Sequence, residues 1–316
     1  MVGQLMLVRM HGSEPTQAFL DRIRHGELGG VVLYDVNFPS GNPKPLIELL
    51  QSAATVGHQP KLLIAIDQEG GAVKRLPGAP TVAPPKMTRA SVARAQGLAT
   101  ARNLRRYGIN VDFAPVLDVN HGGFIASRSF GKTASQVATR GGAFARGLAI
   151  GGVAATAKHF PGLGYAKLST DDSVATINVS AARLRADWKP YRTAQLPLVM
   201  VSTAVYPTLG EHVPAATSRV IITTLRQLGY DGVVVTDALQ TPAVTRYYST
   251  PEAATRAIWA GADLVLAGGT TGSSRDSDVA TATFDAVLAA AKSGRIKAKT
   301  LRDAYARVLR LKSSVP

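Results

Sequence analysis

The chain of 316 residues contains no cysteine, which excludes disulfide bonds, thiolate metal sites and cysteine nucleophiles without fixing a compartment. Long apolar runs are also missing, since no stretch approaches the ~20 residues that span a bilayer. Met1 leads within four residues into the apolar stretch QLMLVRM, and no leader-like charged region, apolar region and cleavage site precede it. We therefore expect a protein with no membrane span that is cytoplasmic as written, or one exported with a leader that this sequence omits.

Acidic residues are scarce: 21 Asp and Glu stand against 36 Lys and Arg, which gives a net charge of +15. Such a charge favours anionic partners. The basic residues are mostly scattered, however, and the local cluster Arg102, Arg105 and Arg106 falls on one predicted helix. Aromatic residues are few, at 6%, and are not interleaved with the basic ones as in nucleic-acid-binding modules. The pattern indicates a solvated basic surface, and we expect no nucleic-acid partner.

What the sequence does have is apolar residues, at 46%, arranged in eight short runs. Most runs are nearly continuous in apolar residues, as expected of parallel strands covered on both faces. The runs are QLMLVRM (4–10), GGVVLYD (29–35), KLLIAID (61–67), NVDFAPVLD (110–118), GGVAATAKHF (151–160), LPLVMVSTA (196–204), DGVVVTDAL (231–239) and ADLVLAG (262–268).

Longer stretches of helical character separate these runs. One covers residues 90–108, with Val92, Leu98 and Leu104 on its predicted apolar face, and others cover 134–152, 251–262, 281–294 and 299–314. Alternating strands and helices indicate a parallel sheet, and eight repeats indicate an α/β fold of the (β/α)8 TIM-barrel type. The length also fits two domains, but no G-x-G-x-x-G fingerprint of an open nucleotide-binding sheet follows the first run. We predict a single barrel domain over residues 1–316.

Polar residues recur where the predicted strands end, which is where barrel enzymes carry their active sites. They are Asp67, Gln68 and Glu69 after the third run, Asp118 and Asn120 after the fourth, Lys158 and His159 in the fifth, Ser202 and Thr203 in the sixth and Asp237 in the seventh. Charged groups at the end of an apolar strand are costly unless they are paired or bind a ligand. Several on one rim therefore indicate a site.

Carboxylates and basic groups around a barrel mouth suit a carbohydrate ligand, because Lys and Arg donate to sugar hydroxyls and Asp accepts from them. Glycoside cleavage commonly uses two carboxylates beside an oxocarbenium-like transition state. A metal site is the competing interpretation, but HExxH and tight His/Asp clusters are lacking. We therefore predict no metal and no cofactor.

Five ordered motifs carry a resemblance to a known family. They are IAIDQEGGAVKRL (64–76), GINVDFAPVLDVN (108–120), SRSFG (127–131), KHFPGLG (158–164) and GYDGVVVTDAL (229–239), with GADLVLAG after them. In this order they resemble glycoside hydrolase family 3, and most of all its single-domain bacterial β-N-acetylglucosaminidases. The resemblance covers about residues 3–310 and implies a β-glycosidase that acts with retention of configuration.

The resemblance assigns Asp237 as the nucleophile that forms a covalent glycosyl-enzyme. Its place at the end of a β-branched strand suits a rigidly held nucleophile, although an Asp there could also cap the next helix. The substrate-binding residues that the resemblance implies are Asp67, Arg75, Arg128, Lys158 and His159. Arg75 and Arg128 are alternatively structural ion-pair partners. Glu69 is expected to support its loop.

One segment departs from the family pattern. The family continues KHFPGHG with a mobile loop that carries Asp-Ser-His, whose Asp–His pair acts as the general acid/base. Here Leu163 replaces the second histidine of the first motif, and the loop reads STDDSV, with Val174 at the histidine position. Asp171 and Asp172 remain in the loop as adjacent carboxylates that could raise one another's pKa.

Three explanations are open. Asp171 or Asp172 acts as the acid/base, a residue such as His121 or His212 reaches in from another loop, or hydrolysis is lost. The two aspartates could also be no more than a solvated turn. The leading hypothesis is an exo-acting β-N-acetylglucosaminidase or β-hexosaminidase. The alternatives are a β-glucosidase-like hydrolase with a non-histidine acid/base and an inactive sugar-binding barrel. The expected partner is a small carbohydrate or a cell-wall glycan fragment; the oligomeric state is open, with a monomer compatible.

Overall fold

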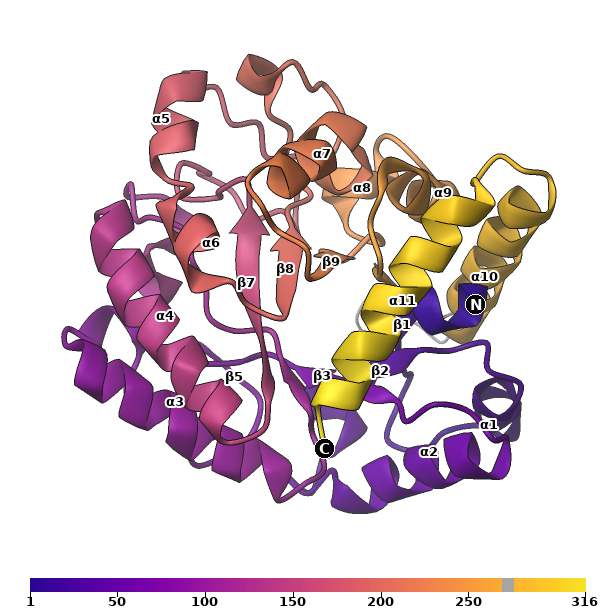
Figure 1. Ribbon diagram of the computed structural model, residues 1–316. Coiled ribbons are helices and arrows are strands. Elements are labelled where there is room, and N and C mark those ends of the chain that lie inside the picture. The colour runs from indigo at the N-terminus through magenta and orange to yellow at the C-terminus, as the bar shows by residue number, and fades with distance from the viewer. Residues whose placement is uncertain (269–275) are drawn as a thin grey trace.

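Eight parallel strands form the centre of the molecule, and each apolar run of the sequence contributes one of them (Figure 1). The computed structural model describes residues 1–268 and 276–316. The strands are β1 (Met6–Arg9), β2 (Gly30–Val32), β3 (Leu63–Ile66), β6 (Val111–Asp112), β7 (Ala154–Phe160), β8 (Leu198–Val201), β9 (Val233–Thr236) and β10 (Val265–Ala267).

The sheet closes on itself. Its order is β10-β1-β2-β3-β6-β7-β8-β9, so each strand lies beside its neighbours in the chain and β10 returns to β1. Val235 of β9 forms a parallel bridge with Leu264, just before β10, and the Thr236 amide donates to the Leu264 carbonyl at 3.0 Å. These contacts join the two remaining edges, which confirms the predicted barrel and places all eight carboxyl ends at one mouth.

All eight strands are shorter than the apolar runs that predict them, and the first and fourth runs show how. Residues 2–5 form a 3-10 helix, so only Met6–Arg9 of the first run is strand. The fourth run is regular only at Val111–Asp112, because Pro115 has no N–H to give to a ladder. Beyond it the pairing with β7 continues irregularly, and Leu117 donates to the Lys158 carbonyl at 2.6 Å. This irregular segment delivers Asp118 to the mouth.

The helices surround the strands. They are α1 (Gln17–Arg24), α2 (Lys44–Val56), α3 (Ala90–Arg105), α4 (Ala134–Ile150), α5 (Ala181–Ala186), α6 (Lys189–Ala194), α7 (Arg219–Gln227), α8 (Pro242–Thr245), α9 (Thr250–Ala260), α10 (Asp276–Lys292) and α11 (Ala298–Ser314). Local signals fix their ends. In α9, the Ser249 hydroxyl accepts from the Glu252 amide at the start, and Gly261 ends the helix at φ 114°, which favours glycine.

The predicted apolar face of α3 is only partly correct. Leu104 is buried, but Val92 and Leu98 are half-buried, and the inward face consists of Ala93, Gly97, Thr100 and Ala101 instead. These small residues allow α3 to pack closely against α4. In the described part of the chain, residues 1–268 and 276–316, no helix combines the length and apolar content needed to cross a membrane.

A small hairpin of β4 (Gln68–Gly70) and β5 (Val73–Lys74) follows β3 directly at the mouth. The side chain of Gln68 is fully buried and satisfies the backbone of the loop that follows: it donates to the carbonyls of Leu76 and Ala79 and accepts from the amides of Arg75 and Leu76. The hairpin therefore holds Asp67, Glu69 and Arg75 at fixed positions around the mouth.

Candidate active site

A cavity of about 570 Å³ opens at the carboxyl ends of the strands. Its walls come from segments that lie far apart in the sequence, as expected where eight strand ends converge. The polar residues that line it are Arg9, Tyr34, Asp35, Asp67, Arg75, Arg128, Lys158, His159, Ser169, Thr170, Asp171, Asp237, Gln240 and Thr241. Seven of the eight predicted catalytic and binding residues lie here, and Asp172 is the exception.

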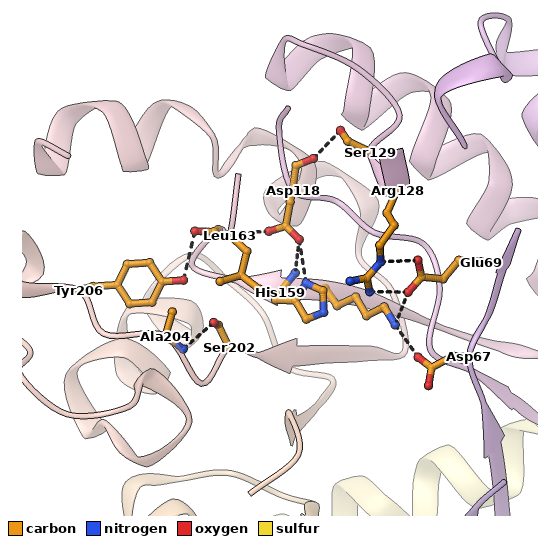
Figure 2. A network of polar contacts seen from close by, with 12 residues as sticks. Asp67, Glu69, Asp118, Arg128, Ser129, His159, Leu163, Ser202, Ala204 and Tyr206 are labelled. Atoms are coloured by element: carbon orange, nitrogen blue, oxygen red, sulfur yellow. Dashed lines mark hydrogen bonds and ion pairs between the residues drawn. The ribbon is translucent and has the colours of Figure 1, made fainter. Parts of the chain in front are cut away.

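Lys158 is the centre of a charged network at the cavity wall, whose other members, Asp67, Glu69 and Arg128, are labelled in Figure 2. Its Nζ lies 2.6 Å from Oδ1 of Asp67 and 2.6 Å from Oε1 of Glu69. Arg128 donates two hydrogen bonds to the same Glu69, from Nε to Oε2 at 2.8 Å and from Nη2 to Oε1 at 2.7 Å. Glu69 was expected to support its loop, and these contacts show that it also holds Lys158 and Arg128. Arg128 is both an ion-pair partner and a residue of the cavity wall.

The network is charge-balanced despite its burial. Burial alone would raise the pKa of Glu69, but the charges of Lys158 and Arg128 outweigh it and hold that pKa at about 2. Burial likewise disfavours a charged Lys158, yet Asp67 and Glu69 raise the pKa of its ammonium. Two cations thus face two carboxylates. Asp67 keeps part of its carboxylate in the cavity, where it can accept hydrogen bonds from ligand hydroxyls.

His159 is oriented by a buried carboxylate. Oδ2 of Asp118 accepts from the backbone amide of His159 at 3.2 Å and lies 2.7 Å from its Nδ1, while Oδ1 accepts from the Leu163 amide at 2.6 Å (Figure 2). An ionised carboxylate only accepts, so Nδ1 carries a proton. That leaves Nε2 as the other functional nitrogen of a side chain that lines the cavity.

Asp237 directly follows β9 and is held by the backbone. Its amide donates to the Val201 carbonyl at 2.9 Å, and its Oδ1 accepts from the Ala238 amide at 2.7 Å. The carboxylate therefore stands at a strand end with a defined orientation and borders the cavity. This is the rigid placement that a nucleophile requires.

The loop that departs from the family pattern brings only one of its two aspartates to the cavity. Asp171 lines it, and its amide donates to the Ser169 hydroxyl at 3.1 Å. Burial in the cavity wall raises the pKa of Asp171, and the negative charge of Asp237 raises it further. The carboxylate whose charge helps to keep Asp171 protonated is thus Asp237, and not the adjacent Asp172 as the sequence suggested. Both aspartates are exposed, but Asp172 is not part of the wall, so the geometry does not support it as a catalytic group.

Neither histidine considered as a substitute reaches the cavity wall. His121 lies 2.8 Å from Asp187 through Nε2, and its ring stacks on Tyr165 with centroids 3.8 Å apart. His212 is exposed elsewhere. Leu163 does line the cavity, in place of a titratable group, whereas Val174 does not.

The described residues contain no group of three His, Cys, Asp or Glu side chains that could hold a metal ion. Near the mouth, the carboxylates of Asp67 and Glu69 are paired with the Lys158 ammonium.

Asp112 is a buried carboxyl close to Asp67 and Glu69. Burial, together with the negative charges of Asp67 and Glu69, raises the pKa of Asp112 to about 8. Near neutral pH this carboxyl is therefore predominantly protonated.

Comparisons with known proteins agree with this geometry. Residues 1–311 match the sequence model of the glycosyl hydrolase family 3 N-terminal domain. The chain belongs to glycosyl hydrolase family 3. Family 3 membership confirms the resemblance seen in the motifs and the prediction of a glycosidase, a hexosaminidase-like β-glycoside hydrolase.

Several relatives of this family 3 chain have names that mention hexosaminidase or N-acetylglucosaminidase activity. A β-hexosaminidase of Bordetella avium is 33% identical over 280 residues, covering 83% of this chain and 79% of the relative. A β-N-acetylhexosaminidase structure from Beutenbergia cavernae aligns with a TM-score of 0.85 at 32% identity, over 99% of this chain and 97% of that one.

A family 3 β-N-acetylglucosaminidase from Paenibacillus sp. aligns with a TM-score of 0.91 at 35% identity, over 99% of this chain. This chain spans 61% of the length of that protein.

The sequence patterns gave no role to some residues of this family 3 site. Asp118 stood out as a strand-end carboxylate, but its bonds to His159 depend on the irregular path after β6. Arg9 and Tyr34 also line the cavity, with the Arg9 guanidinium 4.2 Å from the Tyr34 ring centroid. Both lie at the ends of the first two predicted strands, and the rule that barrel sites form at strand ends could have found them.

Proposed function

We propose that this chain is a retaining β-N-acetylhexosaminidase in which Asp237 is the nucleophile and Asp171 the general acid/base. The observation that carries the proposal is that both carboxylates border one cavity, above the Lys158 network. The names of the B. avium and B. cavernae relatives support the choice of sugar.

The first step transfers the sugar to the enzyme. Protonated Asp171 gives its proton to the glycosidic oxygen as the bond between that oxygen and the anomeric carbon breaks, and the Asp237 carboxylate forms a bond to the same carbon. In the second step Asp171 takes a proton from a water molecule, whose oxygen attacks the anomeric carbon and releases Asp237. Configuration is retained because inversion occurs twice.

The remaining cavity residues position the sugar. Asp67 accepts from ring hydroxyls, while Arg128 and Lys158 supply positive charge and His159 presents Nε2. Arg75, 3.7 Å from Asp35 through Nη1, closes one side of the wall. These groups are fixed by their own ion pairs before a ligand arrives, so little side-chain ordering opposes binding.

The test compares substrates and variants. Wild type is expected to hydrolyse a chromogenic β-N-acetylglucosaminide faster than the matching β-glucoside, and Asp237→Ala is expected to lose turnover of both. Asp171→Asn should lose most activity toward a glycoside with a poor leaving group but much less toward a dinitrophenyl glycoside, whose departure needs no proton. Asp172→Asn is the matched control and should behave as wild type. Equal loss in both loop variants would contradict the assignment of Asp171.

A second candidate function is a sugar-binding barrel without hydrolysis. Leu163 favours it, because an apolar side chain lines the cavity where the family pattern has a histidine. Calorimetric titration with N-acetylglucosamine oligosaccharides, combined with product analysis, separates the two. Binding without any product across β-glycosides would support this alternative and exclude the hydrolase.

A further inference from the structure

A row of aromatic rings and guanidinium groups lies on the outside of the barrel along α9. Trp259 is one of two tryptophans in the chain and is 44% exposed, whereas the other, Trp188, is 4% exposed. Tyr247, shortly before α9, is 39% exposed. Large aromatic side chains left this open to solvent often mark binding surfaces when they occur together.

Contacts connect these rings into one surface, which we call the α9 row. Tyr247 and Tyr248 have ring centroids 6.4 Å apart, and the Arg256 guanidinium lies 4.4 Å from the Tyr248 ring. Arg256 and Trp259 are three residues apart on α9 and so are neighbours on the helix surface. The Arg219 guanidinium, from α7, lies 5.2 Å from the Trp259 ring. The α9 row consists of these five side chains.

The row starts beside the active site. Thr241 and Pro242 line the cavity, α8 begins at Pro242, and Tyr247 follows two residues after α8 ends. Both α7 and α8 pack against α9 (Figure 1). A chain that enters the cavity by one end can therefore continue over α8 onto the row.

The charge of this surface is positive. Its carboxylate, Glu252, is shared between Arg256 at 2.8 Å and Arg295 at 2.6 Å. Arg219, in the row, and Arg246, which directly precedes Tyr247 in the chain, are exposed, and within the described residues no carboxylate lies at ion-pair distance from either. Arginine binds carboxylates with two parallel hydrogen bonds, so these two groups are suited to acidic ligands.

We propose that the α9 row is a second glycan-binding surface that holds the distal part of an acidic glycan chain whose terminal sugar occupies the cavity. The exposed faces and edges of Tyr247 and Trp259 contact the apolar faces of sugar rings, and Arg219 and Arg246 bind carboxylates on the chain. The proposal rests on the proposed glycosidase function for the occupant of the cavity, and it extends the substrate class from a single terminal sugar to a longer acidic chain.

Tryptophan fluorescence tests the surface directly, because Trp259 is exposed and Trp188 is buried. The probe is a tetrasaccharide of alternating N-acetylglucosamine and glucuronate, added to an Asp237→Asn variant so that it stays intact. We expect a saturable change in emission that disappears in Asp237→Asn with Trp259→Phe. Calorimetry should show affinity reduced at least about tenfold by Tyr247→Ala or Arg219→Ala in the same background.

Two controls separate this surface from general charge effects. Arg106 lies 5.3 Å from the Tyr107 ring after α3, in an equivalent stack away from the row, and Tyr107→Ala should leave the affinity unchanged. In the otherwise wild-type enzyme, Tyr247→Ala and Arg219→Ala should leave kcat/KM for a small chromogenic substrate unchanged.

The proposal is overturned if Trp259 emission does not respond. It is also overturned if neutral N-acetylglucosamine tetrasaccharide or inorganic polyphosphate binds the row as tightly as the acidic tetrasaccharide. Absence of hydrolysis by wild type would refute the proposed function alone, since the fluorescence measurement needs no turnover.

Discussion

Asp118 links the irregular segment after β6 to the active site through a single carboxylate. Its three acceptor contacts, to the backbone amide and Nδ1 of His159 and to the Leu163 amide, make it a positioning residue that sets the ring tautomer. It does not border the cavity itself. Its effect on the reaction must therefore pass through His159.

We expect Asp118→Asn to lower kcat/KM by about 10- to 100-fold, by analogy with the loss of carboxylates that orient metal-binding histidines. An amide offers one acceptor oxygen where the carboxylate offers two, so Nδ1 of His159 no longer has to carry the proton. Long-range nitrogen–proton NMR spectra of His159 should show a changed tautomer. Ser129→Ala is the control: its hydroxyl bonds the Asp118 carbonyl at 2.7 Å, and the tautomer should not change. An unaltered His159 spectrum in Asp118→Asn would contradict the positioning role.

The pH profile should report Asp171. The proposed mechanism needs Asp171 protonated in the free enzyme, so it predicts that kcat/KM falls as pH rises through the pKa of Asp171. Burial and the charge of Asp237 raise that pKa, and the alkaline limb should therefore lie above the ordinary aspartate range. For a dinitrophenyl glycoside, which leaves without a proton, this limb should vanish from the glycosylation step. A limb that persists with that substrate would point to another acid.

At this scale the sequence predicted which side chains line the cavity better than it predicted their contacts. Asp67, Lys158, His159 and Asp237 could be placed at the cavity because strand ends converge at a barrel mouth. Asp171 and Asp172 could not be told apart, because they are adjacent in a loop without a repeating pattern. The raised pKa of Asp171 comes from burial and from a residue 66 positions along the chain, so no local pattern contains it.

At the scale of elements, the close contact between α3 and α4 depends on glycine. A Cβ added at Gly97 would lie 2.1 Å from the Phe144 carbonyl oxygen, and one at Gly147 would lie 2.3 Å from that of Arg94. Both obstacles are backbone atoms of the facing helix, so they cannot rotate away. The two helices can approach this closely only with hydrogen at these positions.

Gly97→Ala is expected to destabilise the protein by about 1–3 kcal/mol, the usual cost of overpacking. Gly142→Ala, on α4, is the matched control, since the nearest atom to its added Cβ is a flexible Arg146 nitrogen at 3.6 Å. There the better helix propensity of alanine should stabilise by about 0.5–1 kcal/mol. Urea unfolding measures both, and a loss of stability in both variants would refute the explanation.

Sequence periodicity located every strand of the barrel but not the packing of α3. The apolar positions Val92 and Leu98 suggested one face, whereas the buried face is made of alanine, glycine and threonine. Small residues carry little hydropathy, so a pattern built on large apolar side chains overlooks them. The shortening of the fourth strand, by contrast, could be predicted from the sequence, because Pro115 lacks the N–H that a strand ladder needs.

At the scale of the whole molecule, a buried lysine joins the two ends of the chain. Lys312 of α11 is 7% exposed, and its Nζ donates to Oε1 of Gln4 at 2.6 Å. Burial lowers its pKa from 10.5 to about 7. At pH values between these two pKa values, Lys312 is protonated in the unfolded chain and neutral in the folded protein. The free energy of unfolding therefore rises with pH across this range.

Replacing Lys312 by Met removes that dependence. The free energy of unfolding of Lys312→Met minus that of wild type should be greatest at or below pH 7. Above pH 7 this difference should decline by up to about 1.4 kcal/mol per pH unit, because the stability of wild type rises there. Urea unfolding at pH 6, 7, 8 and 9 gives the comparison. Lys299→Met, which removes an exposed lysine, should show no such trend. A difference independent of pH would mean that Lys312 is charged in the folded protein.

The two carboxylates proposed for catalysis have different mechanical supports. Asp237 stands on the barrel frame, whereas Asp171 belongs to an exposed loop whose amides bond Ser169. Exchange of the proton donor therefore requires rebuilding one short surface segment, and the nucleophile and sugar pocket stay as they are. Replacement of residues 169–174, by engineering or in evolution, can therefore change the pH at which the enzyme is most active without changing the sugar that it binds.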